Sequence, residues 1–198
     1  QVRGIEGRAT KAYWSGYAQL LPPSAQHRDE SPERPYHSKT WGFKGRNRRP
    51  PLDPVNSLIS FLAVLLTYNI YSIIELCGLT PYVGVLHSSQ RRAPALAFDL
   101  IEEFRAPLVE GVALSLVGKR ILSLSDFEWR DTPKGEGIFI RKSALPKALK
   151  AFEAAMSAER EHPHFGLRGD MRRMIPLQVL HFAACIDRDD PYKPFILR

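Results

Sequence analysis

The sequence is poor in cysteine and lacks the short motifs that mark several large enzyme classes. Cys77 and Cys185 are its only cysteines, and they form no Cys-x-x-Cys pair, which argues against a zinc ribbon or a dithiol redox site. We expect two reduced thiols. There is no glycine-rich phosphate loop of the Walker type and no Gly-x-Ser-x-Gly turn. Nucleotide hydrolysis and serine acyl transfer are therefore not supported.

The sequence also shows no secretory signal and no uninterrupted membrane-spanning run. Its longest apolar stretch, from Leu58 to Leu76, contains several polar residues, among them Asn69 and Glu75. A spanning helix needs about 20 mostly apolar residues. We therefore interpret this stretch as a buried core helix and expect no membrane association. The first residue is Gln1 rather than methionine, which is compatible with a fragment, a trimmed product or part of a fusion.

Negative charge is the scarcer kind in this chain. Against 21 Asp and Glu residues stand 28 Lys and Arg residues, which gives a formal net charge of +7 and a pI near 9.6. Basic surfaces attract polyanions, so the composition favours a nucleic acid as partner. Arg46, Arg48 and Arg49 form a compact cluster. It either contacts DNA phosphates, which would position a duplex without reading its sequence, or is a solvated loop.

Apolar residues at helical spacing predict a mainly α fold, with one helical catalytic domain over residues 1–198. Helices are expected over residues 3–21, 53–76, 95–117, 143–161 and 167–187, the second with Asp53 as its N-cap. Glycines and a Gly-Ile-Phe-Ile run predict one small β-ribbon near residues 123–142. Residues 22–51, rich in proline and arginine, are expected to form a long basic surface loop.

Acidic side chains and one histidine are the candidates for metal chemistry. Asp99 and Glu102 lie three residues apart on a predicted helix, so their Cβ atoms are about 5–6 Å apart on one face and both can approach one ion. Carboxylates suit magnesium, and a histidine such as His87 admits manganese as well. The alternatives are a solvated helix face for the acids and a buried loop residue for His87. Glu103 and Glu110 are expected to be surface acids.

Four patterns follow one another along the chain, and together they favour a catalytic site over the structural alternatives. They are Arg3-x-x-Glu6-Gly7 with Tyr13-Trp14, the Arg-Arg-Pro-Pro stretch from Arg48 to Asn56, the loop from Gly78 to His87, and the helix from Leu96 to Arg105, with a late Tyr-x-Pro-Phe from Tyr192 to Phe195. With these motifs the chain resembles the catalytic C-terminal domain of the CRISPR-associated integrase, the universal spacer-acquisition endonuclease of CRISPR adaptation.

The resemblance implies a site for Mg²⁺ or Mn²⁺ and a DNA-binding surface. By the family pattern Glu6, His87 and Glu102 match the three metal ligands, and Asp99 matches an additional catalytic acid beside them. DNA-backbone contacts are expected from a set of arginines, namely Arg3, Arg46, Arg48, Arg49, Arg91, Arg92 and Arg105. The implied reaction is metal-dependent joining of the 3′-hydroxyl ends of short captured DNA to CRISPR repeat edges by transesterification, with associated endonuclease activity.

The resemblance also implies partners. These are double-stranded DNA (prespacer and CRISPR repeat), a second copy of the chain in a homodimer, and the small dimeric partner subunit of CRISPR adaptation, with fusion to another CRISPR protein domain as a further option. The expected location is the prokaryotic cytoplasm. The family's N-terminal β-rich dimerisation domain is expected to be absent from this chain. Two alternatives stay open: a basic helical nucleic-acid-binding module without catalysis, and metal-dependent hydrolysis alone.

Overall fold

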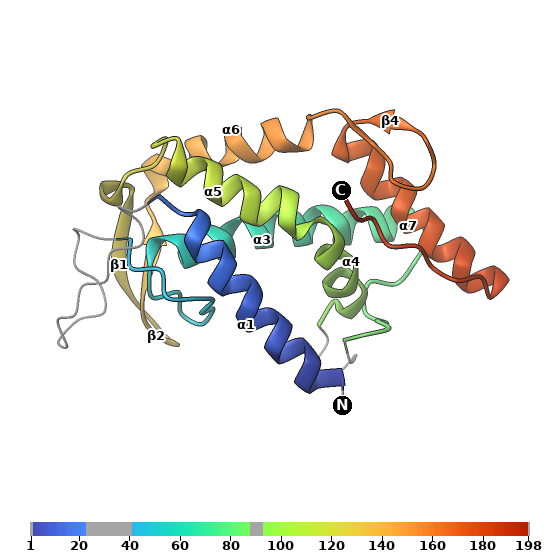
Figure 1. Ribbon diagram of the computed structural model, residues 1–198, viewed down its shortest axis with the longest axis horizontal. Coiled ribbons are helices and arrows are strands. Elements are labelled where there is room, and N and C mark those ends of the chain that lie inside the picture. The colour runs from blue at the N-terminus through green and yellow to red at the C-terminus, as the bar shows by residue number, and fades with distance from the viewer. Residues whose placement is uncertain (1, 23–40, 88–92, 198) are drawn as a thin grey trace. The chain divides into compact units, whose positions relative to one another are not determined.

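The computed structural model describes residues 2–22, 41–87 and 93–197, with the side chains described from residue 8 onward (Figure 1). Its elements in chain order are α1 (Val2–Leu20), α3 (Pro54–Leu76), α4 (Ala95–Arg105), a π-helical turn (Ala106–Glu110), α5 (Gly111–Gly118), a 3-10 turn (Leu124–Asp126), β1 (Phe127–Thr132), β2 (Gly135–Ile140), a 3-10 turn (Lys142–Ala144), α6 (Leu145–Met156), β3 (Arg160–Glu161), β4 (Arg168–Gly169) and α7 (Met171–Arg188). This confirms a mainly α fold.

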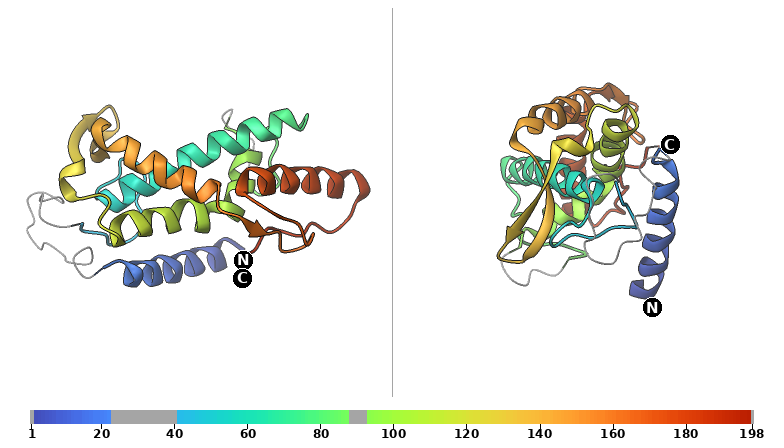
Figure 2. Two further views of the ribbon diagram at one scale, coloured as in Figure 1. Left: turned by 90° about the horizontal axis from the view of Figure 1, so that it is seen from above. Right: turned by 90° about the vertical axis from the view of Figure 1, so that its left-hand side faces the viewer.

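The predicted β-ribbon is present as the antiparallel pair β1 and β2, which is visible as a hairpin in the right-hand view of Figure 2. A second pair, β3 with β4, is only two residues long on each strand and was not predicted. The chain forms two compact units, Gln1–Phe61 with Ala113–Lys150, and Leu62–Val112 with Ala151–Arg198. The prediction of one catalytic domain over residues 1–198 stays a prediction.

In the first unit, α1 packs through aromatic side chains. Trp14, Tyr17 and Leu21 are buried, and the rings of Trp14 and Tyr17 meet Phe43 edge-on with centroids 6.2 and 5.7 Å apart. Helical spacing predicts an apolar stripe through Ile5, Ala9, Tyr13, Tyr17 and Leu20. Of these, Tyr17 is buried, whereas Tyr13 is 46% and Leu20 66% exposed. Helix α1 lies where the spacing predicted it, but Trp14 rather than Tyr13 is buried on its packed face.

A network of polar side chains caps the start of α3. The carboxylate of buried Asp53 accepts hydrogen bonds from the Asn56 backbone N–H (2.8 Å) and from the side-chain amides of Asn56 (2.6 Å) and Asn47 (3.2 Å). Arg46 donates to the Asn56 side chain (2.9 Å) and to Ser60 (3.0 Å). Asp53 is therefore the N-cap that the sequence predicted, and the cap also ties down the preceding basic segment.

The two prolines before this cap hold the β-ribbon. The Ile138 N–H donates to the Pro51 carbonyl (2.8 Å). A Cβ at Gly137 would lie 2.5 Å from the Pro50 Cβ, so only glycine allows this approach. The stretch from Arg48 to Asn56 thus has a structural task that is independent of any bound partner.

Helix α3 is buried along one apolar face. Every fourth residue along this face is fully buried, namely Leu58, Leu62, Leu66, Ile70 and Ile74. It is long and apolar enough to cross a membrane by length and composition alone, the only such helix among the described residues. One face is buried as in a core helix, whereas Val64, Tyr68 and Leu76 are exposed, so the expected burial holds for one side only. The helix ends where Gly78 adopts a φ of +76° and the Leu79 N–H reaches the Ile74 carbonyl (3.0 Å).

The predicted helix over residues 95–117 is interrupted by a π-helical turn. Its expected apolar row is buried throughout, as the six residues Leu96, Leu100, Phe104, Leu108, Val112 and Leu116 show. Pro107 has no N–H to donate to the preceding turn, so the backbone changes register there, and the Gly111 N–H bonds to the Ala106 carbonyl instead.

The last two helices differ from the prediction at their ends. Helix α6 ends at Met156, earlier than expected, because the chain turns into β3. Helix α7 begins at Met171, where the Asp170 side chain accepts a hydrogen bond from the Arg173 N–H (3.0 Å) as N-cap. The helix was predicted to begin at residue 167, but Arg168 and Gly169 form β4, a strand too short to give a pattern in the sequence.

The Asp53 carboxyl gives the first unit a pH-dependent stability. Burial raises its pKa from 3.8 to about 6, despite the opposing hydrogen bonds from Asn56 and Asn47. Between about pH 4 and 6 the folded chain keeps a proton that the unfolded chain releases, so stability falls as the pH rises through this window. A pKa difference of about two corresponds to on the order of 3 kcal/mol.

We expect Asp53→Asn to remove most of this dependence, although the variant is less stable because its amide cannot accept all the bonds of the carboxylate. The measurement is the urea unfolding free energy of wild type and variant at pH 4 and pH 7. Asp131→Asn, which changes an exposed acid on β1, should keep the wild-type pH profile. An unchanged profile in Asp53→Asn would contradict this assignment.

Candidate active site

Asp99, on the buried side of α4, organises the loop that carries His87. Its side chain is 7% exposed. One oxygen accepts hydrogen bonds from the backbone N–H groups of Val85 (2.6 Å) and Leu86 (3.0 Å). The other accepts from the His87 backbone N–H (2.9 Å) and contacts the His87 ring nitrogen Nδ1 (2.7 Å). A carboxylate offers about four lone-pair sites, and these four donors occupy them.

Asp99 is therefore a group that orients His87 rather than a ligand with a free lone pair. Burial acts to raise the pKa of its carboxyl, but the hydrogen bonds from Leu86, His87 and Val85 outweigh it, and the net pKa lies below the ordinary value. An ionised carboxylate can only accept, so Nδ1 of His87 must carry the proton. The lone pair of the neutral ring then resides on Nε2. An imidazole held by a carboxylate in this way is typical of metal-ligating histidines.

The His87 ring is both held and accessible. Its side chain is 51% exposed, and its ring meets the Phe98 ring edge-on, with centroids 6.0 Å apart. The loop reaches α4 so closely because residue 84 is glycine. A Cβ there would lie 2.7 Å from Oδ2 of Asp99 and 2.8 Å from both the Ala95 Cβ and the His87 carbonyl oxygen. The Gly-x-x-His spacing thus encodes the approach of the loop to the helix.

Glu102 lies one turn after Asp99 on α4 and is held by Arg105. Its side chain is 51% exposed, and both its oxygens accept from Nη1 of Arg105 at 2.8 Å. The other nitrogens of the same guanidinium, Nε and Nη2, donate to Glu110 at 3.1 and 2.8 Å. Since positions three apart share a helix face, Glu102 lies one turn away from Asp99, the residue that holds the His87 loop.

The remaining predicted ligand cannot be placed from its side chain. Arg3 and Glu6 are on the first turns of α1, where only the backbone is described, and Arg91 and Arg92 lie outside the described residues. Among the side chains that the structure describes, no group of three or more His, Cys, Asp or Glu could hold a metal ion. The triad Glu6, His87 and Glu102 stays a prediction. The structure holds the His87 loop on Asp99 of α4, and Glu102 follows Asp99 by three residues on the same helix.

The predicted DNA-binding arginines fall into two groups. Arg46 is engaged with Asn56 and Ser60, and Arg105 is 16% exposed between its two carboxylates, so both have structural partners within the chain. Arg48 and Arg49 are exposed. Their side chains are available to a phosphate backbone, and the DNA role of all four stays a prediction.

The expectation that Glu103 and Glu110 are surface acids was wrong. Glu110 is 3% exposed. Glu103 accepts hydrogen bonds from the Tyr192 hydroxyl and from the Phe195 N–H, both at 2.6 Å. Burial raises the pKa of the Glu103 carboxyl, against these hydrogen bonds. Neither role could be read from local spacing, although the late Tyr-x-Pro-Phe pattern was a signal that the end of the chain is constrained.

The segment from Tyr192 to Phe195 fastens the end of the chain to α4 and α7. The Gln178 amide donates to the Tyr192 hydroxyl (2.7 Å) and to the Lys193 carbonyl (2.8 Å), and the Phe195 ring packs on Phe104 with centroids 4.9 Å apart. The helix that carries Asp99 and Glu102 is thereby braced by the last residues of the described chain.

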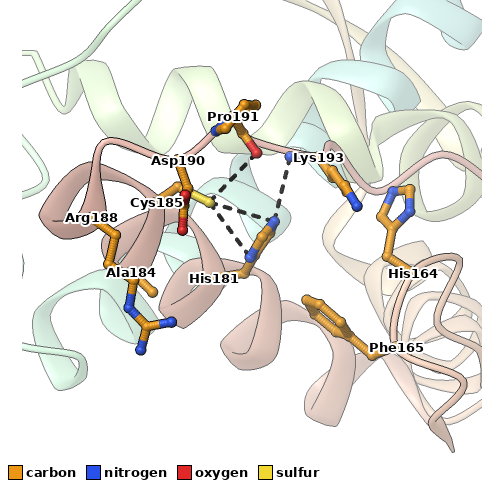
Figure 3. Close-up of a pocket in the computed structure, with 9 residues that line it drawn as sticks. All are labelled: His164, Phe165, His181, Ala184, Cys185, Arg188, Asp190, Pro191 and Lys193. Atoms are coloured by element: carbon orange, nitrogen blue, oxygen red, sulfur yellow. Dashed lines mark hydrogen bonds between the residues drawn. The ribbon is translucent and has the colours of Figure 1, made fainter.

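Beside this segment is a pocket of about 360 Å³ (Figure 3). Its walls include the rings of Phe165 and His181, the buried Cys185 thiol, and the cationic side chains of Arg188 and Lys193. The Lys193 N–H donates to Nε2 of His181 (3.4 Å). Burial, together with nearby His164 and Lys193, lowers the pKa of His181. The His181 ring is therefore neutral near pH 7. The pocket was not predicted, because its residues show no characteristic spacing in the sequence.

We expect Gly84→Ala to displace the His87 loop from α4. The added Cβ collides with backbone and with Asp99, so the four bonds to that carboxylate cannot all persist, and overpacking of this kind costs about 1–3 kcal/mol. The measurement is the long-range ¹H–¹⁵N NMR spectrum of the His87 ring at neutral pH, which reports the Nδ1-protonated form in wild type. In Gly84→Ala the preference for that form should weaken.

Gly16→Ala is the matched control, because nothing lies within 4 Å of the Cβ it adds on α1. It should leave the His87 spectrum unchanged and stabilise the helix by up to about 1 kcal/mol. If Gly84→Ala shows the wild-type nitrogen shifts, the close approach does not hold the loop.

The comparison with known proteins agrees with the geometry. The family model for the CRISPR associated protein Cas1 matches residues 1–154. The chain is 37% identical, over its full length, to a CRISPR-associated endonuclease Cas1 of Thermus thermophilus, of which it covers 54%. It is 32% identical over 96% of its length to part of a CRISPR-associated exonuclease Cas4/endonuclease Cas1 fusion of Rhodospirillum rubrum, covering 30% of that protein. The chain spans about half the length of the first curated relatives it matches.

Solved structures show the same fold. A casposase bound to integration product superimposes with a TM-score of 0.78 at 20% identity, over 98% of this chain and 49% of that one. A partial Cas6-RT-Cas1–Cas2 complex does so with a TM-score of 0.76 at 21% identity, over 98% of this chain and 52% of that one. The family model matches more than half of the chain and the relatives agree with it: the chain belongs to the family of the CRISPR associated protein Cas1.

Proposed function

We propose that this chain catalyses metal-dependent DNA integration, joining the 3′-hydroxyl ends of short captured DNA to the edges of CRISPR repeats. The observation that carries the proposal is the exposed His87 ring, which is fixed through Nδ1 by Asp99, three residues before the exposed Glu102 carboxylate on α4. Membership of the Cas1 family and the endonuclease relatives support it.

The donor set fits Mg²⁺ or Mn²⁺. One imidazole nitrogen and exposed carboxylate oxygen suit a borderline to hard divalent ion, and each has a second partner that orients it, Asp99 for His87 and Arg105 for Glu102. Glu6, His87 and Glu102 would hold the ion. When bound, it would stabilise negative charge on the phosphoryl oxygens of the reacting phosphodiester.

The residues of the chain would contribute orientation and electrostatics. Asp99 keeps the proton of His87 on Nδ1, and Arg105 fixes the direction of the Glu102 carboxylate. Exposed Arg48 and Arg49 would neutralise phosphates of the bound duplex. In the transfer, the attacking 3′-hydroxyl oxygen forms a bond to phosphorus as a 3′-oxygen of the repeat strand leaves with a proton. The number of phosphodiester bonds is conserved, so no nucleotide energy is required.

The same site would cleave DNA when water replaces the 3′-hydroxyl as nucleophile. This accounts for an endonuclease and an integrase with one set of residues. For partners we propose double-stranded DNA as prespacer and repeat, a second copy of the chain, and a small dimeric adaptation subunit like the Cas2 component of the similar complex. Fusion to a further CRISPR domain is proposed by analogy with the Cas4/Cas1 relative. The proposed location is the prokaryotic cytoplasm.

We expect Glu102→Ala to abolish strand transfer and Asp99→Asn to reduce it by about 10–100-fold, since the first removes a ligand and the second the group that orients another. The assay mixes labelled short duplex bearing free 3′-hydroxyls with supercoiled repeat plasmid and Mn²⁺, and measures labelled plasmid. Glu161→Gln, an exposed acid on β3, is the control and should transfer at the wild-type rate. Transfer by Glu102→Ala at that rate would refute the proposed site.

A basic module that binds nucleic acid without catalysis is the second candidate, and the exposed Arg48 and Arg49 favour binding in either case. We expect Arg48→Ala and Arg49→Ala each to reduce the slope of log K against log salt by about 1, for any DNA sequence. Filter binding or fluorescence anisotropy at several salt concentrations measures this slope. Arg46→Gln should instead lower the urea midpoint, because Arg46 bonds to Asn56 and Ser60. Unchanged slopes in both alanine variants would exclude this pair from the DNA surface.

A further inference from the structure

Arg105 is shared between two glutamates of very different exposure. Glu102 on one side is 51% exposed, Glu110 on the other is 4% exposed, and the Arg105 side chain between them is 16% exposed. The guanidinium divides its donors: Nε and Nη2 bond to Glu110, and Nη1 bonds to both oxygens of Glu102. The exposed acid is therefore connected to a buried one through a single rigid cation.

The π-helical turn makes this arrangement possible. In an α-helix, a residue five positions on lies about 140° around the axis, so positions 105 and 110 would face different ways. In the π register, backbone bonds join residues five apart, and here the Gly111 N–H bonds to the Ala106 carbonyl. Residue 110 then returns to the side of residue 105. Pro107, which has no N–H, disfavours the α register at this point.

Glu110 has a physical reason to hold Arg105 firmly. A carboxylate at 4% exposure has lost most of its hydration, and it is tolerated only with a well-placed cation and hydrogen bonds. The Arg105 guanidinium is charged, as arginine always is in proteins, and it donates to both carboxylates. An arginine fork between two carboxylates has few alternative positions.

We propose that Glu110 is a positioning residue for Glu102, acting through Arg105. This rests on the proposed function, in which Glu102 is a metal ligand. A half-exposed glutamate by itself can adopt several rotamers, and an ion that binds only one of them restricts the side chain at a cost in conformational entropy. Glu110 keeps Arg105 in place, Arg105 keeps Glu102 in one orientation, and because Glu110 shares the positive charge, Glu102 retains negative charge for the ion. The buried acid thus tunes the affinity of the site without touching the metal or DNA.

The test is Mn²⁺ binding by the purified chain, followed by electron paramagnetic resonance of the free hydrated ion. Glu110→Gln leaves the whole guanidinium charge to Glu102 and loosens its orientation, so we expect the Kd for Mn²⁺ to rise about tenfold, the lower end of the range for partners of metal ligands. Glu110→Asp keeps the charge and should restore part of the affinity. Arg105→Lys, which keeps a charge but loses the fork, should weaken binding as Glu110→Gln does.

Two controls separate the outcomes. Glu161→Gln makes the same chemical change at an exposed acid and should bind Mn²⁺ like wild type. Glu102→Ala should lose the site: if wild type binds no Mn²⁺, or if Glu102→Ala binds it normally, the proposed metal site itself fails and this inference with it. If those two behave as expected but Glu110→Gln and Arg105→Lys keep the wild-type Kd, only the positioning role is overturned.

A purely structural role for Glu110 is recognised in the same samples. It would lower the thermal midpoint of Glu110→Gln, measured by circular dichroism, and leave the Kd of the folded fraction unchanged, which would overturn the proposal. Strand transfer provides a second readout. We expect the Mn²⁺ concentration for half-maximal transfer to rise in Glu110→Gln by the same factor as the Kd, with most of the rate recovered at saturating Mn²⁺. A reduced rate at every Mn²⁺ concentration, with unchanged half-saturation, would contradict it.

Discussion

The ionised Asp99 carboxylate is the interaction on which the described part of the site depends. Three successive backbone N–H groups, from Val85, Leu86 and His87, converge on it together with the His87 ring. Such a run of amides is a concave anion site, and here the anion belongs to the protein. An asparagine in its place would offer one acceptor oxygen and two unwanted donors. The loop therefore has a defined path without any regular secondary structure, and the ring has a defined tautomer.

The acids between positions 99 and 110 show how environment divides roles among chemically similar groups. Asp99 is buried among donors and orients a ring, Glu102 is exposed and available to an ion, Glu103 faces the end of the chain, and Glu110 is buried against a cation. Their order along the chain follows from helix geometry. The α register places Glu102 and Glu103 on either side of Asp99 around the helix axis. The change to the π register at Pro107 brings Glu110 to Arg105, which also binds Glu102.

Much of the fold was predictable because its signals are local. The Asp53 cap, the Gly78 end of α3 and the buried row from Leu96 to Leu116 each depend on residues within about one helical turn of one another. The errors have physical causes as well. Trp14 displaced Tyr13 from the core because the larger ring buries more apolar surface. The π-helical turn was not predicted, because apolar residues recur every four positions both before and after it, so the sequence pattern does not change where the backbone register does.

The candidate site was predictable only in part, for a related reason. Gly84 with His87, and Asp99 with Glu102, could be identified because each pair lies in one short motif. That Asp99 orients His87 became clear only from the packing of the loop on α4. Glu103 was misjudged because its partners are 89 and 92 residues away in sequence. No periodicity carries that information. Arg46 looked like its neighbours Arg48 and Arg49, and only its bonds to α3 distinguish it.

The bracing of α4 by the end of the chain has a consequence for synthesis. Glu103 adjoins Glu102, and its hydrogen-bond partners are Tyr192 and the Phe195 backbone. A ribosome makes these groups 89 and 92 residues after Glu103, so a nascent chain that already contains all the residues of α4 still lacks the groups that satisfy Glu103. Until they emerge, that carboxylate must stay hydrated, and α4 cannot settle into its final packing. The helix that bears Asp99 and Glu102 therefore obtains the hydrogen-bond partners of Glu103 only after Phe195 has been made.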